Sequence, residues 1–534
     1  MSEVSVVPLR NVSKGEKHND MRKSLKLRIG TILVCFASAI FTQYQSVAPC
    51  VFVFHSTFLA FMYMEHRKWV QWISVLLVSL GLTLSMSQLF RPDEEGQPAW
   101  DWFSVGIVAG IQFAAGHLFW IFSLIHCRLS TVFENSIFIL FCYPVLVVSG
   151  YVLVDMVSPV GSQGSIGYAL SEWLSFVQIV SLFGLSGLNF VILSVAVSVT
   201  HVFLIDDKGR KRGVVAASIG ISMFFGNWIF GSFRLASPFI YQKSVIETAL
   251  PSHGWVTGAC LLMRDDTSMV ARTEAILAAN KDISFVIWSE SAAGVFYDDY
   301  NTPSREQFAA VLSIDLIEPI ANLSSHYNAT IAFTYSVWAV PDDPNDNSRY
   351  NMMSFMDPQK GLIANYSKHH PVPVLENFVT ASKNNVVSAV SSSIGPFNAA
   401  ICFDFDYPSF IRQGTDTGLL IQSANTWGIV GHFHAISSSF RAIENGAHLL
   451  RCGAMGPSGV YDIYGNSLAY QSRMDDGIVY FQIPYAAPQT WTFYSKAGFV
   501  IDYFFFAFSV IFIAVLIASA LRNPKSSIIS PNIV

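Results

Sequence analysis

The sequence predicts a multi-pass α-helical membrane bundle of about eight spans, joined to an extramembrane α/β domain. Only 13% of the 534 residues are charged and 52% are hydrophobic, whereas soluble proteins carry about 25% charged residues. Apolar runs near the ~20 residues that cross a bilayer recur along the chain. One long polar stretch, residues 232–498, interrupts them, and there short β-rich runs alternate with helical stretches.

Charge and cysteine usage narrow the function classes. The net charge of −5 gives no signal for nucleic-acid binding. The seven cysteines lack CxxC and Cys/His spacing, which argues against a zinc site and a disulfide framework. A pair between Cys260 and Cys452 stays open, because spacing alone does not decide it. We therefore expect no metal, no cofactor and no nucleic-acid partner.

The predicted spans are the apolar segments near 29–46, 49–64, 69–90, 103–125, 131–154, 174–200, 213–231 and 499–521. Polar residues and Pro49 interrupt the first two, so a short hairpin is the alternative there. In the run SLFGLSGLNF, Gly184 and Gly187 recur at helical spacing. Small residues at that spacing favour close packing between helices.

Basic residues in the short connectors predict the orientation. They gather in the N-terminal tail, near 67–68, 128 and 208–212, and in the C-terminal tail, whereas the opposite short connectors hold only Arg91. The positive-inside rule then places both termini in the cytosol and the polar domain outside it, in a lumen or periplasm. The predicted order is a polar cytosolic tail (1–28), a seven-span membrane domain (29–231), the extramembrane domain (232–498), an eighth transmembrane helix (499–521) and a cytosolic tail (522–534).

The extramembrane domain has the pattern of a layered α/β fold with buried sheets. Strands are expected at 257–263, 283–289, 329–340, 352–356, 397–403, 418–424, 449–454 and 459–463, and helices at 268–280, 306–327 and 432–446. Glu290 follows one of these strands and Cys402 lies at the end of another. Chemistry in α/β folds gathers at strand ends, so both are candidate site residues.

Cys402 closes an apolar strand before a sharp turn. A thiol at the head of a helix would be favoured as thiolate, and the alternative is a buried structural cysteine. Glu290 follows the apolar run VIWS. There a carboxylate suits a general base that takes the thiol proton, and the alternative is a strand end that faces solvent.

Lys368, in the run NYSKHHPVPVLE, is the third candidate. Acyl transfer at a thiol passes through a tetrahedral oxyanion, which a fixed ammonium and the backbone N–H next to the cysteine can stabilise. His369 and His370 follow it directly. Adjacent residues on a strand point to opposite faces, so we expect these two not to share one site.

Taken in order, Glu290, Lys368 and Cys402 resemble the nitrilase superfamily, whose Glu–Lys–Cys triad lies on an αββα sandwich. The chain is most similar to the apolipoprotein N-acyltransferases, membrane enzymes that hold this domain outside the cytosol between their last two spans. The motifs that carry the resemblance are QIVSLFGLSGLNF, VIWSES, KHHPVPVLE, ICFDFDYP, SANTWG and HAISSSFRAIENGAHLLRCGAMGPSGVYDIYG. The resemblance implies a nitrilase-type sandwich for residues 232–498, with Glu290, Lys368 and Cys402 as the catalytic triad.

The same motifs imply supporting or substrate-binding roles for Glu376, Phe403, Asp404 and Trp427. Two positions depart from the family pattern: Leu375 replaces a glycine, and Phe403-Asp404 replaces Tyr-Glu. Because these positions surround the nucleophile, they bear on the preference for acyl donor or acceptor.

The function implied is a membrane N-acyltransferase. By resemblance, Cys402 would take an acyl chain from a phospholipid donor as a thioester and pass it to an amine-bearing, lipidated acceptor. One alternative is a membrane-tethered carbon–nitrogen hydrolase, an amidase in which water resolves the thioester. Another is a membrane scaffold without catalysis.

Overall fold

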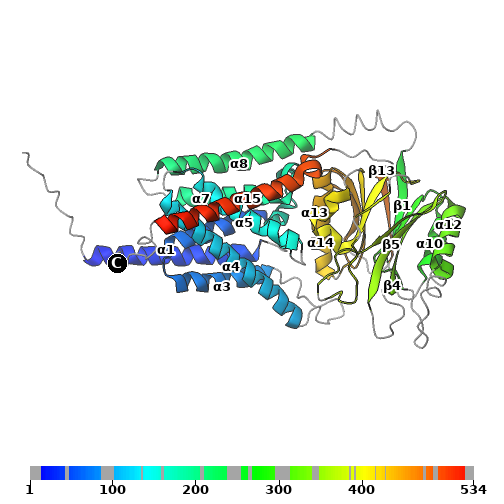
Figure 1. Cartoon of the computed structure of the whole chain (residues 1–534), viewed down its shortest axis with the longest axis horizontal. Helices are drawn as coiled ribbons and strands as arrows, with labels where there is room; N and C mark the ends of the chain where they lie inside the picture. The colour runs from blue at the N-terminus through cyan, green and yellow to red at the C-terminus, as the bar shows by residue number, and fades with distance from the viewer. Residues whose placement is uncertain are drawn as a thin grey trace, which may run out of the picture.

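A computed structural model of the chain defines the fold. It describes residues 14–42, 47–85, 102–133, 136–157, 161–204, 210–236, 254–262, 268–294, 313–338, 348–373, 375–383, 386–389, 392–414, 417–426, 428–472, 477–484 and 491–522. A helical bundle occupies one end of the molecule and an α/β domain the other (Figure 1).

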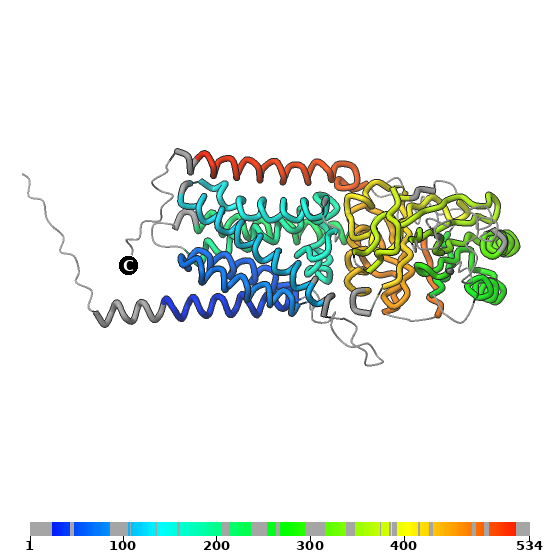
Figure 2. Tube along the Cα trace, turned by 60° about the horizontal axis from the view of Figure 1, so that its bottom comes forward, coloured from blue at the N-terminus to red at the C-terminus, as the bar shows by residue number. Residues whose placement is uncertain are grey.

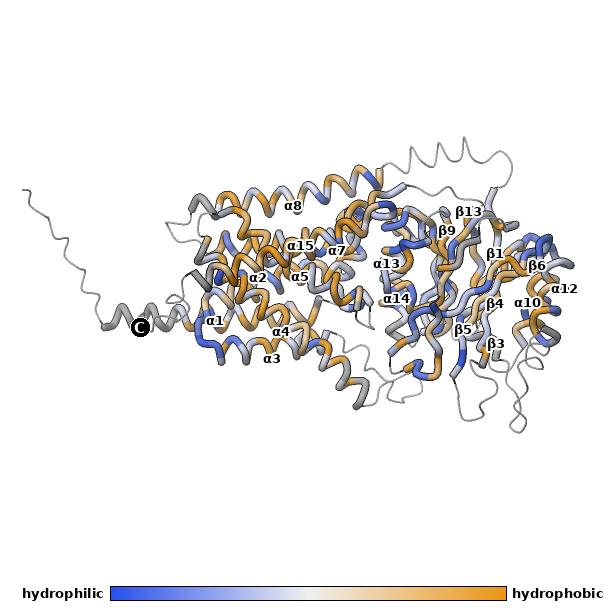
Figure 3. The backbone as a smooth tube through the Cα atoms, viewed as in Figure 1, coloured by the Kyte–Doolittle hydropathy of each residue, from blue (hydrophilic) through white to orange (hydrophobic). Residues whose placement is uncertain are grey.

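The bundle consists of long helices that run roughly along the long axis of the molecule (Figures 1 and 2). They are α1 (Lys14–Ile40), α2 (Ala48–Met64), α3 (Lys68–Ser85), α4 (Trp102–Val132), α5 (Ile139–Val157), α7 (Val180–Phe203), α8 (Arg210–Ala236) and α15 (Phe493–Arg522). Within the described residues, six of them are long and apolar enough to cross a membrane: α3, α4, α5, α7, α8 and α15. Helix α2 is apolar but has 17 residues. Figure 3 shows the hydrophobic residues concentrated in this bundle.

The segment predicted as one span at 174–200 is interrupted. A 3₁₀ turn, η2 (Ile166–Leu170), and a short helix, α6 (Leu174–Val177), precede α7. Within α7 the backbone breaks at Gly184, which has φ +63°. A Cβ there would clash with the Tyr494 ring, so glycine is required by both the left-handed backbone and the close approach. The prediction that Gly184 serves helix packing omitted this break.

Two sheets form the α/β domain. The first has the order β13-β1-β2-β4-β5-β6, with β3 paired to β4, and the second has the order β12-β11-β10-β9-β8-β7. Their strands are β1 (Trp255–Leu262), β2 (Phe285–Trp288), β3 (Ala293–Gly294), β4 (Thr330–Trp338), β5 (Arg349–Asp357), β6 (Gly361–Ser367), β7 (Val387–Ala389), β8 (Phe397–Ile401), β9 (Leu419–Asn425), β10 (His448–Ala454), β11 (Ser458–Tyr461), β12 (Ser467–Gln471) and β13 (Gly477–Pro484). Each sheet has a parallel centre, β1-β2-β4 in one and β8-β9-β10 in the other.

The two sheets bury one common core between them. Side chains of β1, β2 and β5 in the first sheet pack with side chains of β8, β9 and β10 in the second. Helices α10 (Met269–Ala279) and α12 (Glu318–Tyr327, preceded by the π-helical turn η3, Ser313–Ile317) cover the outer face of the first sheet. Helix α14 (Gly428–Asn445) lies beyond the second sheet, and its Phe433, Phe440 and Ile443 pack into the core of the bundle. The second sheet therefore faces the bundle through α14 (Figure 1).

All eight predicted strands are present, whereas β3, β6, β7, β12 and β13 were not predicted. Strand β12 lies at a sheet edge and is largely exposed, so the burial that produces an alternating pattern is absent. The predicted strand at 397–403 ends earlier, at Ile401, because residues Cys402–Asp406 form the 3₁₀ turn η4. The short helices α13 (Pro408–Ile411) and η5 (Arg412–Gly414) follow it.

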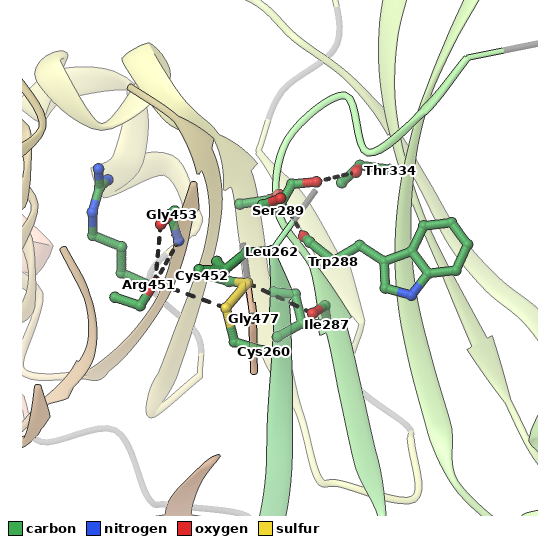
Figure 4. The surroundings of a disulfide bond; sticks show 12 residues. Cys260, Leu262, Ile287, Trp288, Ser289, Thr334, Arg451, Cys452, Gly453 and Gly477 are labelled. Atoms are coloured by element: carbon green, nitrogen blue, oxygen red, sulfur yellow. Dashed lines mark hydrogen bonds between the residues drawn. A yellow bond between two sulfur atoms is a disulfide. The ribbon is translucent and has the colours of Figure 1, made fainter. Parts of the chain in front are cut away.

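A disulfide bond links the two sheets. Cys260 on β1 is bonded to Cys452 on β10, with their Cα atoms 5.5 Å apart. Figure 4 shows the bond crossing the space between the sheets, with Arg451 pointing away from the first sheet. The pairing that the sequence left open is therefore present.

Buried hydrogen bonds hold the α/β domain on the bundle. A Glu444 side-chain oxygen on α14 accepts the Leu185 backbone N–H (3.1 Å), and the Gln178 amide donates to the Tyr464 carbonyl (2.9 Å). Ser162, in the turn after α5, donates both its N–H and its hydroxyl to the Asp406 carbonyl. This last contact brings the η4 turn against the bundle.

Candidate active site

Glu290 lies just beyond β2, whose four residues are fully buried. The residue is 2% exposed. Oε1 accepts hydrogen bonds from Lys368 Nζ (2.7 Å) and Asn351 Nδ2 (2.8 Å), and Oε2 accepts the Asn425 backbone N–H (2.8 Å). These donors come from both sheets, so the carboxylate is fixed in the space between them.

Lys368 follows β6 and is completely buried. Its ammonium lies between two carboxylates, 2.7 Å from Glu290 Oε1 and 2.8 Å from Glu376 Oε1. Burial lowers the pKa of Lys368, but the carboxylates of Glu290 and Glu376 outweigh burial and raise it overall. The lysine therefore remains a cation at neutral pH.

Glu376 closes the loop that follows Lys368. Its Oε1 accepts from the lysine, and its Oε2 accepts the Val372 backbone N–H (2.6 Å). Burial raises the pKa of Glu376, while Lys368 acts against that rise. The loop is thus closed by its own carboxylate.

Cys402 is the first residue of η4 and is 3% exposed. Its φ of +46° is left-handed, which costs a non-glycine residue of order 1–3 kcal/mol and is typical of functional sites. The thiol donates to the Asn425 carbonyl (3.9 Å), and the Cys402 carbonyl accepts from Gln422 Nε2 (2.9 Å). Cys402 is therefore fixed through both its thiol and its backbone carbonyl.

The expectation that a helix N-terminus favours the thiolate of Cys402 is wrong. Burial raises the pKa of the thiol well above its ordinary value, Glu290 adds to the rise, and Lys368 opposes it. The element that begins at Cys402 is a single 3₁₀ turn, which has few free N–H groups to set against the loss of water. Burial therefore favours the neutral thiol over the thiolate at Cys402.

Asp404 ties the lysine segment to the cysteine turn. It is fully buried. Oδ1 accepts the His370 N–H (2.7 Å) and lies 2.9 Å from His370 Nδ1, whereas Oδ2 accepts from the Tyr366 hydroxyl (2.7 Å) and the Ile401 N–H (3.2 Å). Removing this carboxylate would leave several buried donors unsatisfied.

Both histidines after Lys368 pack against the segment that directly follows the cysteine turn, contrary to the prediction. The His370 ring stacks on Tyr407 with 3.6 Å between ring centroids, and the His369 ring stacks on Phe410 at 4.6 Å. Strand β6 ends at Ser367, so the alternation of a strand does not apply to these residues.

Phe403 and Trp427 are the other two predicted site residues. Phe403 is buried and packs edge-on against Tyr407 and His434. Trp427 lies outside the described residues. Sequence reasoning missed Asn351 and Asn425, which hold Glu290. Asn425 stands in the motif SANTWG, which gave a signal, whereas nothing local marks Asn351.

The arrangement supplies a thiol, a carboxylate and an ammonium in a water-poor place. Such a set suits nucleophilic attack by sulfur with proton transfer and oxyanion stabilisation. In the part of the chain that the structure describes, no group of three or more His, Cys, Asp or Glu side chains is placed to hold a metal ion.

The fold and this constellation define the class of the domain. The family model described as carbon-nitrogen hydrolase matches residues 246–491, so the α/β domain is a carbon–nitrogen hydrolase domain. An amidase from Nesterenkonia sp. is similar over 48% of this chain and 98% of its own, at 15% identity and a TM-score of 0.36.

Curated relatives extend the likeness into the bundle. The chain is 27% identical over 375 residues to an apolipoprotein N-acyltransferase of Bradyrhizobium diazoefficiens, and 26% identical over 366 residues to one of Rhodopseudomonas palustris. Each match covers 62% of this chain and 65% of the relative, so the chain spans about two thirds of their length. The protein is apolipoprotein N-acyltransferase-like, a membrane protein with a carbon–nitrogen hydrolase domain.

Proposed function

We propose that the protein is a membrane N-acyltransferase that moves an acyl chain from a phospholipid to an amine through a thioester on Cys402. The observation that carries the proposal is the meeting of Glu290, Lys368 and Cys402 in one buried place, in a domain docked on an apolar helical bundle. The relatives named above are N-acyltransferases.

In the first half-reaction Glu290 takes the proton of the Cys402 thiol as sulfur attacks the donor's ester carbonyl. The Lys368 ammonium and the backbone N–H after the cysteine stabilise the oxyanion. When the tetrahedral intermediate collapses, Glu290 returns the proton to the leaving oxygen of the lysophospholipid. The acyl group is then held as a thioester.

In the second half-reaction an amine attacks the thioester carbonyl. Glu290 removes a proton from the attacking nitrogen, the C–S bond breaks, and the proton returns to the Cys402 sulfur. Because the resting residue is a thiol, each cycle begins and ends in the same protonation state. Glu376, Phe403 and Asp404 support the triad, and we assign Trp427 to substrate binding on the resemblance alone.

The membrane setting belongs to the same proposal. We take all eight long helices to span the bilayer, with both termini cytosolic and the domain on the lumenal or periplasmic side as an αββα sandwich. The start of α1 and the end of α15 lie at the same end of the bundle, far from the α/β domain (Figure 1). The Cys260–Cys452 bond favours an oxidising compartment for the domain.

A two-step labelling experiment tests the proposal. Purified full-length protein in liposomes receives a phospholipid with an alkyne-tagged acyl chain, and the label on Cys402 is followed by its sensitivity to hydroxylamine. We expect label on the wild type and on Cys50→Ala, and none on Cys402→Ala, which should remain folded. Label on Cys402→Ala would overturn the mechanism.

The second step separates transferase from hydrolase. A lipidated peptide with a free amine should discharge the label and become N-acylated, whereas an N-acetylated peptide should leave the thioester in place. Equal loss with both peptides would show that water is the acceptor and the protein is an amidase. Failure of any phospholipid to label a folded protein would favour the scaffold alternative.

A further inference from the structure

A large apolar groove runs between α5, α7, α8 and α15. Its volume is about 780 Å³, within the range of roughly 300–1,000 Å³ typical of small-molecule sites. Nine of its nineteen lining residues are phenylalanines. Among them, the Phe190 ring contacts the rings of both Phe141 and Phe505. Of the side chains that line it, only Ser222 and Asn227 are polar, and the Asn227 amide donates to the Phe176 carbonyl.

The groove opens sideways, toward the surface that faces the bilayer. Phe504 and Phe508 line it and are 50% and 39% exposed. All four helices belong to those long and apolar enough to cross a membrane. A groove at this place meets hydrocarbon, where an acyl chain gains dispersion contacts with the rings and a polar molecule would lose its hydrogen bonds with water.

A cation lies at the rim nearest the α/β domain. Arg234 follows Phe230, a lining residue, by four positions on α8, so both side chains share one helix face. Its Nε donates to Gln178 Oε1 (3.0 Å), and its guanidinium lies over the Tyr464 ring. Its Nη2 has no hydrogen-bond partner among the described residues.

The charge of Arg234 is available for an anion at this level. The carboxylate that acts electrostatically on Arg234 is Asp462. The Asp462 oxygens already accept hydrogen bonds from Tyr464 and Asn466, within the same turn. Arg234 is two residues from the end of α8, where the bundle meets the α/β domain. Headgroup phosphates lie at such a boundary.

We propose that this groove binds one phospholipid, with an acyl chain against the phenylalanine wall and the phosphate beside Arg234. The site lies on the bundle and needs no acyl transfer, so it stands or falls independently of the proposed function. A bound lipid would contact α7 and α8 at the place where Gln178 joins the bundle to Tyr464 of the α/β domain.

Gly226 offers a way to fill the groove. It lines the groove on α8, and a Cβ added there would meet nothing within 4 Å. Gly226→Phe should therefore occupy the acyl site without disturbing the helices. Ser222→Phe, one turn away, is a second filling variant in case the first folds poorly. Gly110 on α4 also has nothing within 4 Å but does not line the groove, so Gly110→Phe is the matched control.

The experiment uses the full chain in nanodiscs of unlabelled phosphatidylcholine with two photoreactive probes. One is a phosphatidylcholine with a diazirine in mid-chain, and the other is a diacylglycerol with the same chain. We expect crosslinks from both probes on peptides of α7, α8 and α15. Gly226→Phe and Ser222→Phe should reduce them about tenfold, because the acyl chain loses its dispersion contacts with the rings, whereas Gly110→Phe and Cys402→Ala should label like the wild type.

Arg234 is tested by the difference between the probes. Arg234→Gln should reduce capture of the phospholipid roughly fivefold, from the loss of one basic residue at a lipid surface, and leave capture of the diacylglycerol unchanged. Arg234→Lys should retain phospholipid capture. Equal labelling of folded groove-filling variants and the control would overturn the proposal, as would an equal loss of both probes in Arg234→Gln. Crosslinks between α8 helices of two chains in place of lipid would instead identify a second copy as the occupant.

Discussion

Glu444 of α14 accepts the backbone N–H of Leu185, one residue beyond the break of α7 at Gly184. Both ends of this 3.1 Å contact are buried, and Arg441 lies 2.9 Å from the same carboxyl group. The break frees an N–H that a continuous helix would have used, and a side chain of the α/β domain satisfies it. One of the buried contacts that hold the domain on the bundle is therefore made by a carboxyl group.

That carboxyl group should make stability depend on pH. Burial raises the pKa of Glu444 from its ordinary 4.5 to about 7, although Arg441 opposes the rise. A raised pKa means that the folded state binds the proton more tightly. The stability that protonated Glu444 contributes to the folded state is therefore complete below pH 4.5. About 3 kcal/mol of it is lost as the pH rises to about 7.

Denaturation midpoints between pH 4 and pH 8 in detergent would measure this effect. The wild type should lose stability across that window. Glu444→Gln keeps a group that can accept the Leu185 N–H but does not titrate. The fall in stability that Glu444 causes between pH 4 and pH 8 should therefore be absent from the variant, even if its stability differs from that of the wild type at every pH. Parallel curves for the two proteins would contradict the assignment.

Lys368 should be essential for both stability and activity. Lys368→Met leaves Glu290 and Glu376 facing each other without their shared cation, and breaking a buried ion pair in this way costs about 3–5 kcal/mol. The double variant Lys368→Met/Glu376→Gln removes one of the two stranded charges and should recover part of the loss. Unfolding midpoints of the single and double variants measure this recovery, and thioester labelling should be absent from both.

A double variant no more stable than Lys368→Met would show that Glu376 does not share the lysine. The single variant Glu376→Gln is the matched reference for this comparison. It keeps the Val372 N–H acceptor within the same loop.

The disulfide should stabilise the domain. The bond closes a separation of 192 residues, and removing a native disulfide typically costs about 2–5 kcal/mol. Cys260→Ser should lower the unfolding midpoint accordingly. A reducing agent should lower the midpoint of the wild type and leave that of Cys260→Ser unchanged. If the fully reduced wild type keeps the unfolding midpoint of the oxidised protein, the bond does not stabilise the domain.

Reporter fusions should separate the two sides of the membrane. A reporter inserted after Arg212, beside basic residues, should read cytosolic, and one inserted after residue 345 should read non-cytosolic. The physical reason is that α8, which is long and apolar enough to cross the bilayer, lies between them. Readings on the same side would remove α8 as a span and place the triad at the cytosolic leaflet.

Local pattern was a good guide to the buried strands. The central strands β1, β2, β4, β9 and β10 lie close to their predicted positions because burial on both faces gives continuous apolar runs. Strand β12 has no such run. Its place at the sheet edge depends on pairing with β11, and the residues Ser467–Gln471 contain no pattern that predicts this pairing.

The candidate site shows the same division. Motif order and resemblance identified Glu290, Lys368 and Cys402, and the structure places them together. Resemblance also selected Glu376 and Asp404, but the tie from Asp404 to His370 could not be predicted, because β6 ends two residues before His369.

The sequence by itself determined the apolar segments, the α/β alternation and the order of the candidate triad, because each of these depends only on residues that are close together along the chain. Only the tertiary structure decided that burial favours the neutral thiol at Cys402, that Cys260 is bonded to Cys452, and that Glu444 accepts the Leu185 N–H. The physical reason is that pKa, disulfide pairing and buried hydrogen bonds depend on burial and on partners far away along the chain. Those partners become neighbours only when the two sheets close and α14 packs against the bundle.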